Sequence, residues 1–220
     1  MQPAGLAAAK QLAAILAAAA AGRFPPADGR ATVLPQPSGR DAGVIAFTGH
    51  AVIFADTDPA WLTSQLPPGD FAAPLSARFL HALSQRFGRA ADGIDMLACA
   101  PPLAGPPGLE LGDETDPAHP RIQRALRYRD DVRAWQADGG VVMLGRGVAG
   151  RWEVAIEVDP ASRSQGRGAA LATAARHLVP GAAPLWAQIA PGNAASVRAF
   201  LAAGFRPMGA EALLSPSESG

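Results

Sequence analysis

The stretch VAIEVDPASRSQGRGAALATAARH, residues 154–177, decides the fold. Its apolar alternation, which includes Ile156 and Val158, predicts a strand, and an alanine-rich segment after Gly166 and Gly168 predicts a helix. A glycine turn between a strand and a helix presents unpaired backbone N–H groups at the positive end of the helix dipole. This order of elements predicts a site for an anion, most often a phosphate.

Spacing separates three kinds of phosphate-binding loop. A dinucleotide-binding fingerprint requires three glycines, as GxGxxG, and the third glycine is missing here. A Walker loop requires a Lys-Ser/Thr pair after its last glycine, and the chain's one lysine is Lys10. What remains is Arg-x-x-Gly-x-Gly, from Arg163 to Gly168, directly after the strand. A glycine turn that only connects an ordinary strand and helix is the alternative interpretation.

A second motif follows about 30 residues later, in PLWAQIAPGNAASVRAFLAAGFRPMG, residues 184–209. The segment 185–189 predicts a short strand. Asn193 is a good N-cap for the helix after it, and Gly204 suits the position just beyond the C-terminus of that helix. Together with Ser196 and Phe200, these residues give the pattern Asn-x-x-Ser-x-x-x-Phe-x-x-x-Gly-Phe.

Both motifs, in this order, resemble those of the GNAT superfamily of acyl-CoA-dependent N-acyltransferases. The resemblance covers about 95 residues, 121–215, and implies a central mixed, mostly antiparallel twisted sheet flanked by helices, within the α/β class. We therefore expect a GNAT-like acetyltransferase domain over 113–220. Residues 1–112 form an N-terminal α/β region of unmatched type, which either completes the sheet or makes a separate domain.

The resemblance implies acetyl-CoA as co-substrate. Its diphosphate would bind the backbone of the glycine loop, and its pantetheine arm would pair with the preceding strand and meet the asparagine of the second motif. The cofactor-binding residues implied in this way are Ile156, Val158, Arg163, Ser164, Gln165, Gly166, Arg167, Gly168, Ala169, Asn193, Ser196 and Phe200.

Two glutamates are candidates for the catalytic base that removes a proton from the attacking amine. Glu153 and Glu157 lie on one face of the predicted strand, opposite its apolar residues. Phe200 occupies the place where many GNAT enzymes carry a tyrosine that protonates the leaving thiolate, and a phenylalanine cannot donate a proton. Two functions stay open: transfer of an acetyl group to an amine by direct attack in a ternary complex, and noncatalytic acyl-CoA binding or sensing.

Composition bounds the partners. The net charge of zero gives no support for nucleic acid or an anionic membrane as partner. The resemblance implies a small-molecule or peptide amine as acceptor, and a homodimer is a further option. Cys99 is the single cysteine, so an intrachain disulfide is excluded. We expect Cys99 to be a small apolar residue of the core. The four histidines show no ligand spacing, so no metal is expected. The N-terminal segment faintly imitates a signal peptide, but a cytoplasmic protein is expected.

The remaining elements follow from periodicity and from the positions of glycine and proline. Residues 23–40, with four prolines, are expected to be a loop, and residues 100–120 an exposed connection. Helices are expected over 6–21, after Asp58, over 75–87 and over 168–178; strands are expected over 43–56 as a hairpin, 94–99, 128–136, 141–145, 152–158 and 205–214, with the start of the 128–136 strand uncertain because 122–126 has helical character.

Overall fold

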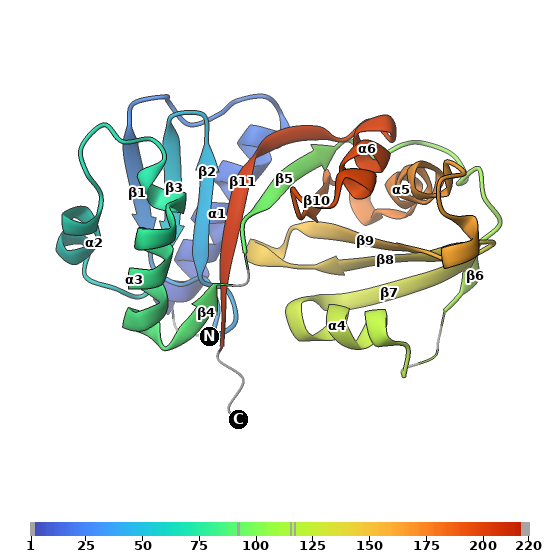
Figure 1. The fold of residues 1–220 in the computed structure, drawn as a ribbon, viewed down its shortest axis with the longest axis horizontal. Helices are drawn as coiled ribbons and strands as arrows, with labels where there is room; N and C mark the ends of the chain where they lie inside the picture. Colours follow the sequence, from blue (N-terminus) through green and yellow to red (C-terminus); the bar gives the residue numbers. More distant parts are fainter. Residues whose placement is uncertain (1–2, 92, 115, 117, 217–220) are drawn as a thin grey trace. The chain divides into compact units, whose positions relative to one another are not determined.

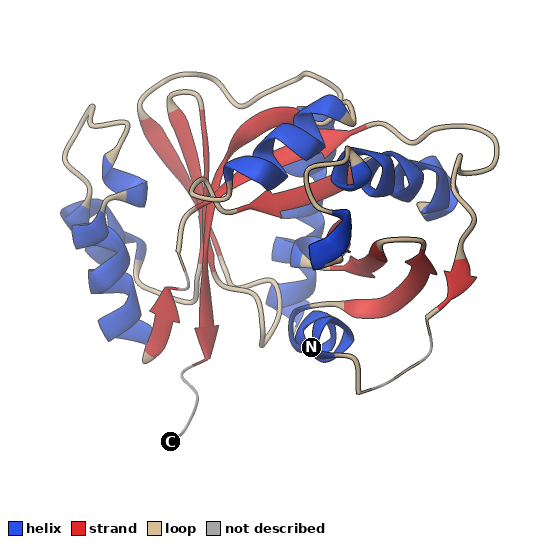
Figure 2. Cartoon of the chain, turned by 45° about the vertical axis from the view of Figure 1, so that its right-hand side comes forward, coloured by secondary structure: helices blue, strands red, loops and turns tan. Residues whose placement is uncertain are grey.

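A computed structural model describes residues 3–91, 93–114, 116 and 118–216 of the chain (Figures 1 and 2). The chain forms two compact units: residues 1–96 with 208–220, and residues 97–207. Each unit combines helices with strands, and most strand pairs are antiparallel. Among the pairs whose register the described residues define, β1 with β3 and β9 with β10 are parallel. The predicted α/β class with a mixed, mostly antiparallel sheet is therefore confirmed.

The first unit has strands in the order β1-β3-β2-β11, with β4 paired to β11. Its last strand, β11, comes from the far end of the described chain and pairs antiparallel with β2. The elements of this unit are α1 (Pro3–Ala20), β1 (Arg30–Leu34), β2 (Gly43–Phe47), β3 (His50–Phe54), α2 (Pro59–Gln65), the 3-10 turn η1 (Ala73–Leu75), α3 (Ala77–Phe87), β4 (Arg89–Ala91) and β11 (Arg206–Pro216).

Local chemistry explains where helix α3 of the first unit begins and ends. Ser76 caps α3 by accepting a hydrogen bond from the N–H of Phe79, and Gly88 ends the helix in the left-handed region at φ 60°. Phe79 and Leu83 lie on the buried face of α3 and pack against strand residues such as Ile53. Helix α1 lies on the opposite face of these strands (Figures 1 and 2).

The loop predicted over 23–40 is wrong in its middle, because Arg30–Leu34 forms the strand β1. The ring of His50 on β3 supports this strand: one nitrogen lies 2.9 Å from Oγ1 of Thr32 and the other 2.8 Å from Oδ1 of Asp28. The hydrogen bond from His50 lowers the pKa of Asp28. The flanking prolines favour the interpretation of this segment as a loop. The strand is stabilised by its pairing with β3, which lies further along the chain.

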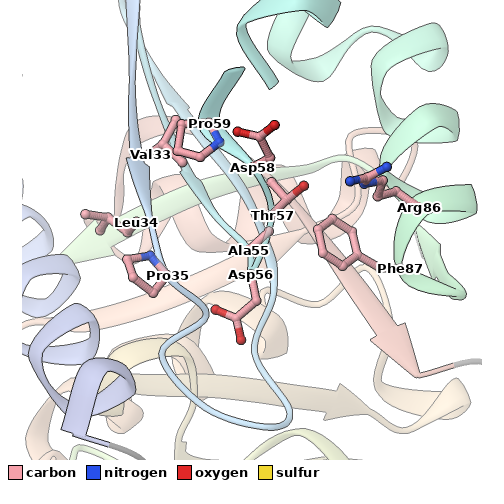
Figure 3. A pocket seen from close by; sticks show the side chains of 10 residues that line it. All are labelled: Val33, Leu34, Pro35, Ala55, Asp56, Thr57, Asp58, Pro59, Arg86 and Phe87. Atoms are coloured by element: carbon pink, nitrogen blue, oxygen red, sulfur yellow. The ribbon is translucent and has the colours of Figure 1, made fainter. Parts of the chain in front are cut away.

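At the carboxyl ends of the parallel strands β1 and β3 lies an open hollow of about 510 Å³ (Figure 3). Leu34, Thr57 and Phe87 are among the residues that line it. It contains none of the residues that the two sequence motifs identify.

The second unit holds both sequence motifs. Its strands follow the order β5-β10-β9-β8-β7-β6, where β5 contributes the residues from Leu97 onward. Its elements are β5 (Asp95–Ala100), β6 (Gly112–Asp113), α4 (Pro120–Tyr128), β7 (Asp130–Ala137), β8 (Gly140–Arg146), η2 (Val148–Gly150), β9 (Trp152–Val158), η3 (Pro160–Ser162), α5 (Arg167–Leu178), η4 (Pro180–Ala182), β10 (Leu185–Ile189) and α6 (Ala194–Ala202).

Two helical layers cover these strands. Helices α5 and α6 lie on one side of β8 and β9, and α4 lies on the other (Figure 1). Ile122 and Ala125 of α4 are buried against Val141 and Met143 of β8. The helical character of 122–126 is thus explained by α4, while the connection predicted over 100–120 contains the short strand β6.

Candidate functional site

The parallel strands β9 and β10 separate soon after they meet. They share the pairs Leu185 with Trp152 and Trp186 with Glu153, although β9 continues to Val158 and β10 to Ile189. The other edge of β9 pairs with β8 along its full length. The edge of β9 that faces the opening therefore carries backbone N–H and C=O groups able to hold an extended ligand as an added strand.

The glycine loop lies directly at the end of β9. Ser164 has a φ of 61° and Gly166 a φ of 77°, so two residues of the loop adopt left-handed backbone just before α5 begins at Arg167. Gly166 is the N-cap residue, and no side chain caps this helix. The first N–H groups of α5 consequently point out of the helix end, where an anion is favoured by both hydrogen bonding and the helix dipole.

The two glycines of the loop serve different purposes. A Cβ at Gly166 would meet nothing within 4 Å, so glycine is favoured there by its positive φ alone. Gly168 has an ordinary backbone, but a Cβ there would lie 3.1 Å from Cβ of Ala199 and 3.7 Å from Cγ2 of Val158. Gly168 thus allows α5 to pack closely on α6 and β9.

The arginines at the loop also differ. Arg167 turns back to Asp138 in the turn between β7 and β8, with Nη2 to Oδ2 at 2.8 Å. This pair borders an open hollow of about 760 Å³ that Gln136 also lines. Arg163 is exposed, like the neighbouring Gln165. Because Arg167 is paired with Asp138 and Arg163 is exposed, Arg163 is better placed to attract an anion to the loop.

Asn193 of the second motif caps the N-terminus of α6, as predicted. The side chain of Asn193 accepts a hydrogen bond from the N–H of Ser196 at 3.1 Å and so caps α6. Phe200 is 5% exposed, and its ring meets that of Phe205 edge to face at 5.0 Å. Phe200 is therefore part of the core that holds α6 against the strands.

Glu153 sits at the closed end of the opening, inside an ion cluster. Its Oε1 accepts from Nε of Arg151 at 2.8 Å, and its Oε2 accepts from Nε of Arg129 at 2.9 Å. Burial by itself would raise the pKa of Glu153, but Arg151 and then Arg129 outweigh burial and hold the pKa below its ordinary value of 4.5. With both oxygens bound to guanidinium groups, Glu153 is poorly placed to accept a proton from an amine.

Glu157 lies nearer the open end of β9, on the same side as Glu153. It forms an ion pair with Arg121 of α4 at 3.0 Å, with 37% of its side chain exposed. Ala155, between the two glutamates in the alternation, packs on the α4 side of the sheet. The prediction that both glutamates share a face agrees with this packing, and Glu157 is the more accessible of the two.

Arg129, at the closed end of the opening, escaped the sequence analysis. Arg129 donates from Nη2 to Oε1 of Gln188 on β10 at 3.4 Å, in addition to its bond with Glu153. Arg129 therefore joins β9 to β10 where the strands part. No local pattern marks it, because its partners lie 24 and 59 residues further along the chain.

Cys99 of β5 is buried, as expected of a small core residue. Burial raises the pKa of its thiol to about 12.

Within the described part of the chain, no group of three or more His, Cys, Asp or Glu side chains is arranged to hold a metal ion. None of the helices formed by the described residues has the length and apolar character needed to cross a bilayer.

Comparison with known proteins shows a likeness to solved structures. No family model matches the chain, and no curated protein does. Among solved structures, the chain is similar to a "GCN5-related N-acetyltransferase from Kribbella flavida", with a TM-score of 0.41 and 18% identity, over 99% of this chain and 97% of that chain.

Proposed function

We propose that this chain is an N-acyltransferase that moves an acetyl group from acetyl-CoA to an amine by direct attack in a ternary complex. The observation that carries the proposal is the separation of β9 from β10 next to an uncapped helix end with left-handed loop residues. One feature suits an extended pantetheine arm and the other suits a diphosphate. The two sequence motifs that resemble GNAT enzymes fall on these two features.

The residues of the chain would bind and orient the reactants. The thioester supplies an activated acetyl group, and a backbone N–H on the open edge of β9 would stabilise negative charge on its carbonyl oxygen. The amine nitrogen forms the new bond to the carbonyl carbon while the carbon–sulfur bond breaks. The proton lost by the amine passes to Glu157 or to water, and the thiolate takes a proton from water.

Binding and turnover test the two parts of the proposal separately. A calorimetric titration with CoA tests the site, and release of free thiol from acetyl-CoA with a panel of amines tests transfer. We expect binding, and thiol release with at least one amine. Failure to bind CoA would remove the proposal altogether.

A matched pair of glycine variants tests the loop itself. Gly166 and Gly181 both have positive φ, 77° and 68°, and a Cβ at either meets nothing within 4 Å. Each change to alanine should cost about 1–2 kcal/mol of stability for the left-handed backbone. Only Gly166→Ala should weaken CoA binding, by roughly tenfold. Equal affinities in the two variants would mean that the loop does not hold the diphosphate.

Noncatalytic acyl-CoA binding is the second candidate. Two observations favour it: Phe200 offers no proton to a thiolate, and both oxygens of Glu153 are occupied by arginines. Tight binding of acetyl-CoA without thiol release on any amine would support this second function.

A further inference from the structure

Arg167 lies beside the proposed diphosphate site, but an aspartate holds its guanidinium. Arg167 is the first residue of α5, and its Nη2 lies 2.8 Å from Oδ2 of Asp138 in the turn between β7 and β8. The pair borders the open hollow that Gln136 also lines. An ion pair at such an open position is weak, so a stronger anion can replace the aspartate.

The turn that carries Asp138 is fixed against the glycine loop. The N–H of Asp159, at the end of β9, donates to the carbonyl oxygen of Gly139 at 3.0 Å. A Cβ at Gly139 would lie 2.6 Å from Oγ of Ser162 and 3.0 Å from Nε of Arg167. The absence of a side chain at Gly139 therefore lets Arg167 cross the turn and reach the carboxylate.

The side chain of Arg167 can also serve the end of its own helix. Side chains of an α-helix tilt toward its N-terminus, so a residue in the first turn projects toward the end where an anion binds. A guanidinium forms paired, charge-assisted hydrogen bonds with phosphate oxygens, which are stronger than an exposed ion pair. Two anions therefore compete for Arg167: the carboxylate of Asp138 and a diphosphate at the start of α5.

Positive and negative charges balance around the loop. Residues 159–168 contain Arg163, Arg167 and one carboxylate, that of Asp159, and the turn adds the carboxylate of Asp138. The side chain of Asp138 is 92% exposed, whereas that of Arg167 is 27% exposed. Because water already surrounds the aspartate, release of Arg167 leaves no buried charge behind.

Given the proposed function, on which this inference rests, we propose that Asp138 is a positioning residue that competes with the diphosphate of CoA for Arg167. As CoA enters, the guanidinium leaves Oδ2 of Asp138 and binds a phosphate oxygen. Since the ion pair has to break each time CoA binds, Asp138 weakens the complex. Arg167 thus strengthens binding, and Asp138 sets how much of that strength is realised.

A double-mutant cycle on CoA affinity, measured by calorimetry, tests the exchange. Asp138→Asn should tighten binding about three- to fivefold, and Arg167→Gln should weaken it by about as much. In the Arg167→Gln background, Asp138→Asn should change the affinity by less than about 1.5-fold, because nothing is left to compete for. Equal effects of Asp138→Asn in the two backgrounds, or weaker binding in Asp138→Asn alone, would overturn the proposal.

Asp159→Asn is the matched control. It removes a carboxylate from the same loop but leaves the pair of Asp138 with Arg167 in place. Its effect on CoA affinity should be the same in the wild-type and the Arg167→Gln backgrounds. If Asp159→Asn depended on Arg167 as strongly as Asp138→Asn does, the cycle would report general electrostatics, and the exchange would be refuted.

Two outcomes separate this inference from the proposed function. If CoA binds neither the wild type nor any variant, the proposed function fails, and the exchange fails with it. If CoA binds with the same affinity in Asp138→Asn and the wild type, the exchange alone is refuted. A crystal structure of the CoA complex should show the guanidinium of Arg167 on a phosphate oxygen; Arg167 still bound to Asp138 would overturn the proposal.

Discussion

Trp186 on β10 lies opposite Glu153 on β9 in the last residue pair that these two parallel strands share. Around this pair, Arg151 binds Glu153 and lies 5.6 Å from the centre of the Trp186 ring, while Arg129 reaches both Glu153 and Gln188. The point where the strands part is therefore held by a charge cluster.

Glu153→Gln should destabilise the fold by about 3 kcal/mol, because it leaves Arg129 and Arg151 without their shared carboxylate in a buried site. Urea unfolding at neutral pH measures this loss. Glu157→Gln is the control: the exposed Glu157–Arg121 pair should contribute less than about 1 kcal/mol. Equal losses in the two variants would contradict the structural role of Glu153.

The same carboxylate should shape the acid sensitivity of the protein. Because the folded pKa of Glu153 lies below the ordinary 4.5, its contribution to the free energy of unfolding is present above about pH 4.5 and lost as pH falls through the lowered folded value. Stability measured from pH 7 to pH 3 should therefore fall less steeply in Glu153→Gln than in the wild type. Parallel curves would show that Glu153 titrates alike in the folded and unfolded states.

Gly168→Ala should weaken the packing of α5 on α6, because the added Cβ lies only 3.1 Å from Cβ of Ala199. We expect a loss of roughly 1 kcal/mol, partly recovered when Ala199→Gly is added. A double-mutant cycle by urea unfolding gives the coupling energy, which should be favourable and about 0.5–1 kcal/mol. If the effects of the two substitutions on the free energy of unfolding were strictly additive, the loss in Gly168→Ala would not come from contact with Ala199.

Arg163→Gln should weaken CoA binding about two- to fivefold at low salt, since an exposed arginine beside a phosphate site acts mainly through its charge. The effect should shrink at 1 M salt, where the screening length is about 3 Å. Arg78→Gln, an exposed arginine on α3, is the control for general surface charge. A loss of affinity that persists unchanged at high salt would indicate a direct structural role.

The thiol of Cys99 should resist alkylation and disulfide exchange in the folded protein, because its pKa of about 12 leaves almost no thiolate at pH 8. Reaction with a chromogenic disulfide should be negligible in buffer and complete in denaturant. Rapid labelling of the native protein would show that β5 opens locally.

Much of the second unit is readable from its sequence, because its signals are local. The strand limits predicted at 152–158 and 185–189 match β9 and β10, and Asn193 caps α6 as its position predicts. Alternation along β9 also predicts that Glu153 and Glu157 share a face. Alternation cannot predict the ion pairs of these glutamates, because their partners come from other segments. Glu153 pairs with Arg129, and Glu157 pairs with Arg121.

The first unit was less predictable, for a different physical reason. Strand β1 is flanked by prolines that favour loops, and its stability comes from pairing with β3 and from the contacts of His50. Gly168 shows the same limit on a smaller scale. Its sequence context indicates a glycine loop, but the need for glycine comes from Ala199, about 30 residues away.

The pairing of β11 with β2 has a consequence for biosynthesis. A ribosome releases Gly43–Phe47 long before it has made Arg206–Pro216, so β2 must wait with one edge open while the whole second unit is translated. During that interval, the open edge is a template for pairing with other nascent chains. Chaperone protection of the emerging chain should therefore matter most before the last strand arrives.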